Sequence, residues 1–211
     1  MVTLYTTPLS AMGRKVMALS HHLGLDAEIK LINVYHGEGR TPEYLAINPL
    51  GKVPTLVDGD FTLWESNAIL QYLAEAHGNY KLSSREPRTR ADIARWLFWE
   101  ASQWLPAFHP VLAAFVGQHV LPQTGPSTPV EVNWNHEQFQ AQAKLLDAHL
   151  CGRTFLVGDE LTIADFSVAG MMMYVRPAGF PFHDFPGIAA WYERIEALEA
   201  WKATAAGPWK Y

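Results

Sequence analysis

The first 78 residues alternate short apolar runs with amphipathic stretches. Short runs rich in β-branched and aromatic residues are typical of strands, whereas apolar residues spaced like Val16, Leu19 and Leu23 are typical of a helix. Asp58-Gly59 between two such runs is a strong hairpin signal. The pattern predicts strands over residues 2–6, 27–33, 55–57 and 61–64, and helices over 12–23, 42–47 and 65–77. Residues 1–78 are therefore expected to form a compact α/β domain of order βαβαββα with a mixed sheet.

After residue 78 the strand signals end and helical spacing takes over. Residues 79–87 are polar and predict a linker. Helical spacing then continues from Arg88 to Leu121, where Pro106 and Pro110 should bend or split the helix. A loop is predicted over the proline-containing residues 122–129, and further helices over about 135–150, 163–175 and 187–200. Residues 88–211 are thus expected to form a second, all-helical domain.

Composition narrows the class of protein without identifying it. The chain has 211 residues, 49% of them hydrophobic and 18% charged, which is ordinary for a globular protein that can fill a core. A net charge of −5 argues against general nucleic-acid binding, which depends on basic patches. The start of the chain lacks the features of a signal peptide, and no apolar run approaches the roughly 18 residues of a membrane span. We expect a soluble, cytoplasmic protein that binds neither nucleic acid nor membrane.

Cysteine and histidine usage argues against a metal site. Cys151 is the only cysteine, so an internal disulfide framework and a multi-cysteine zinc site are excluded. The nine histidines include no His-x-x-x-His pair. Cys151 precedes Gly152 and is interpreted as an ordinary small residue at a helix end. We therefore expect no metal.

The stretch Asn-Pro-Leu-Gly-Lys-Val-Pro, residues 48–54, places prolines where a strand is about to begin. Proline withholds a backbone donor, so a strand entered in this way gives up a ladder hydrogen bond. Glu65-Ser66 and Leu-Thr-Ile-Ala-Asp-Phe, residues 161–166, follow. With the βαβαββα pattern, these motifs resemble the cytosolic glutathione S-transferases over essentially the whole chain. The resemblance implies a thioredoxin-like first domain, an all-α second domain (the GST fold) and glutathione as co-substrate.

The resemblance implies how two of these motifs bind glutathione. Pro54 would follow a cis bond that turns the N–H and C=O groups of Val53 toward the cysteinyl part of the tripeptide, as in strand addition. Ser66 would bind the γ-glutamyl carboxylate at a helix N-terminus, with Glu65 close to its ammonium group. Taken alone, the residues also fit simpler roles: Pro54 can shape a turn, and Ser66 can cap a helix.

Two basic residues are candidates for the glycyl carboxylate of glutathione. The family often has histidine where Gly39 stands, followed by a basic residue, and glycine cannot make that contact. The contact would therefore fall to Arg40 and Lys52. Lone basic residues are more often simply solvated, so both assignments rest on the resemblance.

Ser10 is the candidate for holding the glutathione thiolate. Ser10 followed by Arg14 is similar to the serine-type (theta and phi) branches, and we interpret the chain as a bacterial-style member of this type. The Ser10 hydroxyl would donate to the sulfur, and Arg14 would raise the local positive potential. Thr6, Thr7 and Tyr5 are rivals for the donor role, and Ser10 could instead be only a helix cap. The cysteine-type branch would need a cysteine at position 10, so chemistry through a protein disulfide is not expected.

An acceptor pocket for the second substrate is expected between the domains. Its candidates share an apolar side chain and a place beside the predicted site; they are Leu9, Met12, Trp104, Phe108 and Phe115. Each is also a plausible core residue, and Trp209 and Tyr211 could cover the pocket. Thr162 and Asp165 form a capping-box pattern that we interpret as structural.

The function expected from these residues is transfer of glutathione to small hydrophobic electrophiles. Peroxide reduction, dehalogenation and ether cleavage stay open, because each begins from the same thiolate. The alternative is a non-catalytic member of the fold that binds ligands or other proteins, since a fold does not fix a function. The resemblance also implies a homodimer in which the first domain of one subunit faces the helices of the other.

Overall fold

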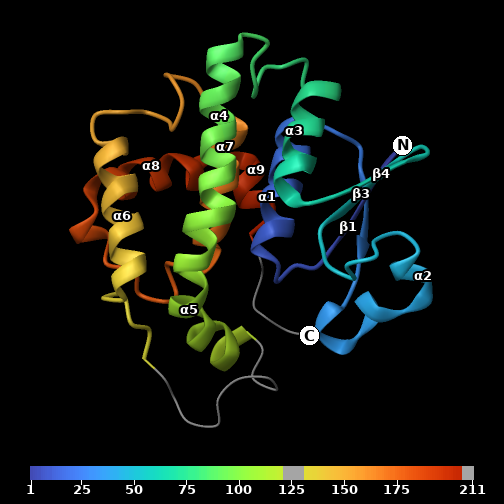
Figure 1. Cartoon of the computed structure of the whole chain (residues 1–211), viewed down its shortest axis with the longest axis horizontal. Helices are drawn as coiled ribbons and strands as arrows, with labels where there is room; N and C mark the ends of the chain where they lie inside the picture. Colours follow the sequence, from blue (N-terminus) through green and yellow to red (C-terminus); the bar gives the residue numbers. More distant parts are fainter. Residues whose placement is uncertain (121–130, 206–211) are drawn as a thin grey trace.

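The computed structural model describes residues 1–120 and 131–205, in which one four-stranded mixed sheet carries the first half of the chain. Its strands are β1 (Val2–Thr6), β2 (Glu28–Leu31), β3 (Thr55–Asp58) and β4 (Phe61–Trp64). They lie in the order β2-β1-β3-β4 (Figure 1). β1 pairs with β2 in parallel, whereas β3 runs antiparallel to both of its neighbours. The predicted mixed sheet and its hairpin are confirmed.

Helices α1 (Ala11–His22) and α3 (Ser66–Ala76) lie side by side against one face of the sheet (Figure 1). Alternate residues of a strand point to opposite faces, and Thr6 of β1 points to this one. A Cβ atom added to Gly13 would lie only 2.1 Å from Oγ1 of Thr6. Glycine at position 13 therefore lets α1 approach β1 closely.

The opposite face of β1 meets the short helix α2 (Pro42–Leu45). Tyr5 points to this side, where its ring lies 5.8 Å from the ring of Tyr44 in α2. The preceding connection contains the short 3₁₀ turns η1 (Val34–His36) and η2 (Glu38–Arg40), which the sequence pattern did not predict. The order βαβαββα is otherwise as predicted.

From residue 87 onward, every described element is helical, and none of the described helices is long and apolar enough to cross a membrane. These elements pack around an aromatic core on the far side of α1 and α3 from the sheet (Figure 1). The elements are α4 (Pro87–Trp99), η3 (Glu100–Trp104), α5 (Leu105–Phe115), η4 (Val116–Val120), α6 (Glu137–Leu150), α7 (Ile163–Gly170), η5 (Met171–Tyr174), η6 (Phe182–Asp184), α8 (Pro186–Ala197) and α9 (Glu199–Ala203).

The long helix predicted from residue 88 divides before its prolines instead of at them. The chain stays helical through Pro106 and Pro110, but η3 just upstream is wound as a π-helix. A helical proline crowds the carbonyl four residues earlier, which for Pro106 belongs to Ser102 within η3. The wider winding of η3 therefore moves that carbonyl away from the proline ring.

Three predicted boundaries differ from the structure. The strand expected over 27–33 forms only as β2, and the helix expected over 163–175 becomes a 3₁₀ helix at residue 171. The helix expected over 187–200 breaks at Leu198, whose backbone is extended. The predicted loop 122–129 and the residues Trp209 and Tyr211 lie outside the described part of the chain.

Asp165 holds the start of α7 in the core. It is fully buried and accepts hydrogen bonds from Leu156 N and Trp191 Nε1, each 2.9 Å long, and from Thr162 N at 2.9 Å. Thr162 caps the helix in return, so the predicted capping box is present. Burial raises the pKa of the Asp165 carboxyl, an effect that these hydrogen bonds oppose.

Asp165→Ala should lower the free energy of unfolding by about 3 kcal/mol, because it leaves buried N–H donors without partners. Urea denaturation would measure the change. Asp159→Ala, at an exposed position in the loop just before α7, is the matched control and should change stability by less than about 0.5 kcal/mol. Equal effects of the two substitutions would contradict the structural role.

Candidate functional site

The N-termini of α1 and α3 lie close together. Ser10 is the N-cap of α1, and Ser66 is the first residue of α3. The Oγ of Ser66 lies 3.5 Å from the Sδ of Met12. Each helix N-terminus presents unpaired N–H groups and a positive dipole end. The pair therefore forms a surface suited to a negatively charged ligand.

Ser10 caps α1 and still keeps a hydroxyl proton. Its Oγ accepts a 3.0 Å hydrogen bond from Gly13 N, and its own N–H donates to Thr7 O. The side chain is partly exposed, and within the described residues its hydroxyl has no acceptor. Because one lone pair does the capping, the proton stays available to a ligand. The capping interpretation is confirmed, and the thiolate role stays a prediction.

The rival hydroxyl groups occupy different surroundings. Thr6 Oγ1 is buried beneath Gly13, and no partner for it lies among the described residues. Thr7 is also buried, with 1% of its surface exposed. Tyr5 lies in β1, as predicted, and packs on Tyr44 at the opposite face of the sheet. Ser10 is thus the partly exposed hydroxyl nearest the start of α1.

Arg14 is directed toward the second half of the chain. Only 7% of its surface is exposed, and its Nη2 donates a 3.1 Å hydrogen bond to Trp201 O. The guanidinium carbon lies 4.2 Å from the centroid of the Trp201 ring. Burial lowers the pKa of Arg14, an effect that Tyr192 and Glu196 oppose. Its contacts tie α1 to α9, so any influence on a ligand beside Ser10 acts through space.

The loop over residues 48–54 presents a free backbone edge. The Val53–Pro54 bond is cis, as the resemblance implied. Asn48 Nδ2 and the Tyr44 hydroxyl both donate to Lys52 O, at 2.9 and 2.7 Å, which fixes the loop from below. Neither backbone group of Val53 has a partner among the residues that the structure describes. The arrangement leaves one N–H and one C=O for an extended peptide.

Glu65 joins the hairpin to α3 in an unusual backbone conformation. Its φ is 72°, in the left-handed region that non-glycine residues rarely adopt. Such a conformation costs on the order of 1–3 kcal/mol and tends to occur at ligand sites. The Glu65 side chain is exposed beside the buried Ser66. The Glu65 carboxylate therefore lies next to the N-terminus of α3.

The structure brings Arg40 to the same loop. A Cβ added to Gly51 would lie 2.4 Å from Gly39 O and 3.3 Å from Nη1 of Arg40. Because Gly39 and Gly51 carry no side chain, the segment before α2 packs directly against the backbone of the loop over residues 48–54. Arg40 and Lys52 are both exposed. They provide positive charge close to Val53.

Of the five acceptor-pocket candidates, Met12 lies beside Ser66, and the other four fall into two groups. Leu9 and Phe115 both lie near Tyr174, at the junction of the two halves. The Leu9 carbonyl accepts a 2.7 Å hydrogen bond from the Tyr174 hydroxyl. The centroid of the Phe115 ring lies 6.3 Å from that of the Tyr174 ring. Trp104 and Phe108 instead have 0% exposure and pack 4.5 Å apart in the aromatic core. All four are buried; Leu9 and Phe115 lie near the junction of the two halves, whereas Trp104 and Phe108 lie in the aromatic core.

Sequence reasoning missed a buried polar cluster directly behind the site. Lys15 is fully buried, and its Nζ donates to Asn67 Oδ1 at 2.7 Å and to Glu100 Oε2 at 3.1 Å. Asn67 Nδ2 donates to the same Glu100 oxygen at 2.9 Å, and Ser167 Oγ donates to Asn67 Oδ1 at 2.7 Å. Burial lowers the pKa of Lys15, and Glu100 opposes this effect. The cluster joins α1, α3, η3 and α7.

A signal for this cluster is present in the sequence. Lys15 stands four residues before Leu19, on the apolar stripe of its helix, and Glu100 stands midway between Trp96 and Trp104 on another. Charged residues are almost never fully buried without a partner. Two opposite charges on two apolar stripes therefore predict a buried ion pair.

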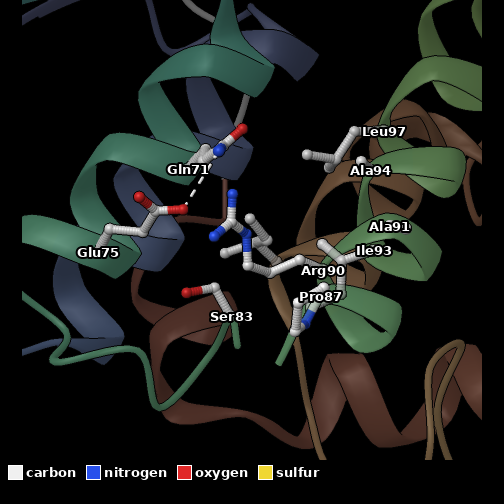
Figure 2. A pocket seen from close by; sticks show the side chains of 10 residues that line it. Gln71, Glu75, Ser83, Pro87, Arg90, Ala91, Ile93, Ala94 and Leu97 are labelled. Carbon is white, nitrogen blue, oxygen red and sulfur yellow. Dashed lines mark hydrogen bonds between the residues drawn. The ribbon is translucent and has the colours of Figure 1, made fainter. Parts of the chain in front are cut away.

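Outside this site, a hollow of about 450 Å³ lies between α3 and α4 (Figure 2). Gln71 and Glu75 of α3 face Arg90 across it, and Gln71 Nε2 donates to Glu75 Oε1 at 3.2 Å. None of the residues predicted to bind glutathione lines this hollow. The described residues also contain no group of three or more histidine, cysteine, aspartate or glutamate side chains that could hold a metal ion.

The Lys15–Glu100 pair yields a prediction for stability. Lys15→Met should lower the free energy of unfolding by about 3–5 kcal/mol, because it leaves the Glu100 charge buried without a partner. The double variant Lys15→Met/Glu100→Leu should lose less than Lys15→Met alone. Denaturation of both single variants and the double variant forms the cycle. Additive losses would show that the two groups do not interact.

Family models match both halves of the chain. The model described as the glutathione S-transferase N-terminal domain matches residues 1–75, and that of the C-terminal domain matches residues 107–199. Among curated proteins, glutathione S-transferase F10 of Arabidopsis thaliana is 31% identical over 211 residues, covering 97% of this chain and 96% of the relative. The first of these matches ends close to the end of α3.

Solved structures are similar over nearly the whole chain. Glutathione transferase F7 from Populus trichocarpa superposes with a TM-score of 0.86 at 29% identity, covering 97% of this chain and 98% of the other. Glutathione S-transferase-I, solved with lactoylglutathione bound, gives a TM-score of 0.85 at 27% identity over 97% and 98% of the two chains. The sheet, the helical second half and these matches agree on the predicted fold. The chain belongs to the glutathione S-transferase family.

Proposed function

We propose that the protein is a glutathione transferase that activates the glutathione thiolate for attack on small hydrophobic electrophiles. The observation that carries this proposal is the convergence of the α1 and α3 N-termini. The free backbone edge of Val53 lies just before Thr55, which pairs with Trp64 at the end of β4, next to the start of α3. Residues 1–78 bind glutathione, and residues 88–211 supply the acceptor side. A relative of similar fold was solved with lactoylglutathione bound, which supports the assignment of the ligand.

Glutathione lies in an extended conformation along the loop. The backbone of Val53 pairs with its cysteinyl unit, in the manner of an added strand. Ser66 and the α3 N-terminus bind the γ-glutamyl carboxylate, and Glu65 lies beside the ammonium group. Arg40 and Lys52 bind the glycyl carboxylate through charge-assisted hydrogen bonds.

The Ser10 hydroxyl donates to the glutathione sulfur and favours its thiolate form. A thiol is mostly protonated at neutral pH, and the thiolate is the nucleophile. Each unit by which the thiol pKa falls corresponds to about 1.36 kcal/mol of preference for the anion. The α1 N-terminus and, through space, the Arg14 charge act in the same direction. The spacing of Ser10 and Arg14 supports membership in the serine-type, theta- and phi-like branches.

The electrophile occupies the junction between the two halves, beside Leu9, Met12 and Phe115. The thiolate attacks an electrophilic carbon, so that a carbon–sulfur bond forms while a leaving group departs with its electron pair. Trp104 and Phe108 belong to the aromatic core behind Leu9, Met12 and Phe115. The site supplies orientation, which lowers the barrier by holding the two reactants in contact.

Ser10→Ala should lower kcat/KM for an aryl chloride by about tenfold to a hundredfold. The expected reason is a rise in the pKa of the bound thiol once its hydrogen-bond donor is lost. Initial rates at saturating glutathione across a pH series would measure both effects. Full turnover by Ser10→Ala would show that another group holds the thiolate.

A second variant separates catalysis from helix capping. Ser10→Asp keeps an N-cap acceptor, but it adds a negative charge beside the sulfur and donates no proton. We expect a thermal midpoint within a few degrees of the parent and activity at or below that of Ser10→Ala. If Ser10→Asp were as active as the parent, the serine would be a structural cap alone.

We also propose that the protein is a homodimer. Large apolar side chains are exposed on both halves: Phe61 and Trp64 of β4 at 44% and 39%, and Phe98 of α4 and Leu145 of α6 at 74% and 48%. A hollow of about 320 Å³ beside Leu145 is lined by Trp96 and other residues of α4 and α6. Apolar surface of this kind favours a partner, and closed symmetric dimers are the commonest solution.

Light scattering should therefore give twice the chain mass at micromolar concentration. Phe98→Glu, at an exposed position of α4, should shift the protein toward the monomer because it places a charge in an apolar interface. Leu31→Glu is the control, since Leu31 is 62% exposed on β2, at the opposite edge of the sheet from β4. A monomeric parent protein would exclude the homodimer.

A further inference from the structure

A cleft of about 310 Å³ lies where α1, α8 and α9 meet, outside the proposed glutathione site. It combines buried and exposed positive charge with an apolar wall. The described residues that line it are Arg14, Met173, Arg176, Pro177, Tyr192, Glu196, Trp201, Lys202 and Ala205. None of these residues except Arg14 enters the proposed transfer of glutathione. The cleft is therefore a separate candidate binding site.

Arg14 contributes a buried positive charge that has no carboxylate partner among the described residues. Its single hydrogen bond goes to a neutral carbonyl, that of Trp201, and its Nε is buried without any partner. Burying an unpaired charge is costly, and a guanidinium cannot lose its proton in a protein. An anion in the cleft would supply both the missing charge and a hydrogen-bond acceptor.

The other charges around the cleft are already paired. Arg176 binds Glu196 through two nitrogens, with Nη2 at 2.6 Å from Oε2, and Lys202 Nζ lies 2.8 Å from Glu199 Oε1. Glu196 is the only carboxylate among the described lining residues, and Arg176 occupies it. Arg14 thus has no carboxylate at ion-pair distance among the described residues, and the Glu196 charge acts on it only through space. The cleft is locally positive in a chain whose net charge is −5.

The remaining lining indicates what kind of anion fits. The side chains of Met173 and Pro177 and the ring of Trp201 are apolar, and the cleft volume lies within the range of small-molecule sites. A hydrated inorganic ion would leave this apolar wall unused. We propose that the cleft binds a small organic carboxylate, with its anionic group toward Arg14 and its apolar body against Met173 and Pro177.

Calorimetric titration of the full chain with benzoate tests the proposal, with benzamide as the neutral probe of the same shape. At constant ionic strength, benzoate should bind once per chain and at least about tenfold more tightly than benzamide, because only benzoate carries the charge that Arg14 lacks. Equal affinities for the two probes, or no binding of benzoate, would overturn the proposal.

Variants of the lining charges should act in opposite directions. Glu196→Gln frees Arg176 and should tighten benzoate binding about threefold, whereas Arg176→Gln frees the Glu196 carboxylate and should weaken binding by a similar factor. Arg14→Gln should abolish binding. The first two variants lie at the rim of the cleft, so they remain informative if Arg14→Gln does not fold.

Lys144→Gln is the matched control for charge. Lys144 is exposed on α6 and does not line the cleft, so its loss should leave benzoate binding unchanged. If Lys144→Gln weakened binding as much as Arg176→Gln, the effect would be one of net charge, and the site would be excluded. Weaker benzoate binding by Glu196→Gln would likewise exclude the site.

A competition experiment separates this cleft from the proposed glutathione site. An S-alkyl glutathione thioether, which fills both the peptide and the acceptor parts of that site, should leave benzoate binding intact. Ser10→Ala should do the same. Displacement of benzoate by the thioether would place both ligands in one site and overturn the proposal. Because benzoate binding is measured directly, loss of transferase activity would not affect this test.

Discussion

The buried ion pair between Lys15 and Glu100 connects the two halves of the protein at the point where the site is built. Lys15 lies in α1, whose N-terminus carries Ser10, and its partner Asn67 immediately follows Ser66 at the start of α3. The Glu100 carboxylate, which belongs to the helical half, therefore holds Ser10 and Ser66 in fixed positions relative to each other. A first domain without its helical partner would leave Lys15 with Asn67 but without a carboxylate to balance its charge.

The loop over residues 48–54 is likewise held in place by residues that lie behind it. The loop that presents Val53 is held from below by Tyr44 and Asn48, and Gly39 and Gly51 let the preceding segment cross it in backbone contact. None of these residues needs to contact a ligand. They hold an otherwise exposed backbone edge in one conformation, which reduces the conformational entropy lost when a ligand binds.

Much of the fold was predictable because its signals are local. Strand length, helical spacing and the Asp58-Gly59 turn predicted the order of strands and α-helices in the first half, although not η1 and η2, and the capping box at Thr162 marked the start of α7. The short motifs at Ser10, Val53-Pro54 and Glu65-Ser66 could also be located, and the ligand roles of their residues stay predictions. What sequence reasoning missed depends on distant partners: Lys15 and Glu100 are 85 positions apart, and the contact of Arg14 with Trp201 spans 187. Neither contact follows from the spacing within one helix.

The π-helical winding of η3 makes chain length, as well as side-chain identity, a determinant of the core. A regular α-helix advances about 100° per residue, and a π turn accommodates an extra residue within the same helix. The inward direction of the aromatic side of α5 depends on that extra residue in Glu100–Trp104. Loss of one residue there would rotate all of α5 relative to α4, so gaps in this segment should be selected against more strongly than replacements.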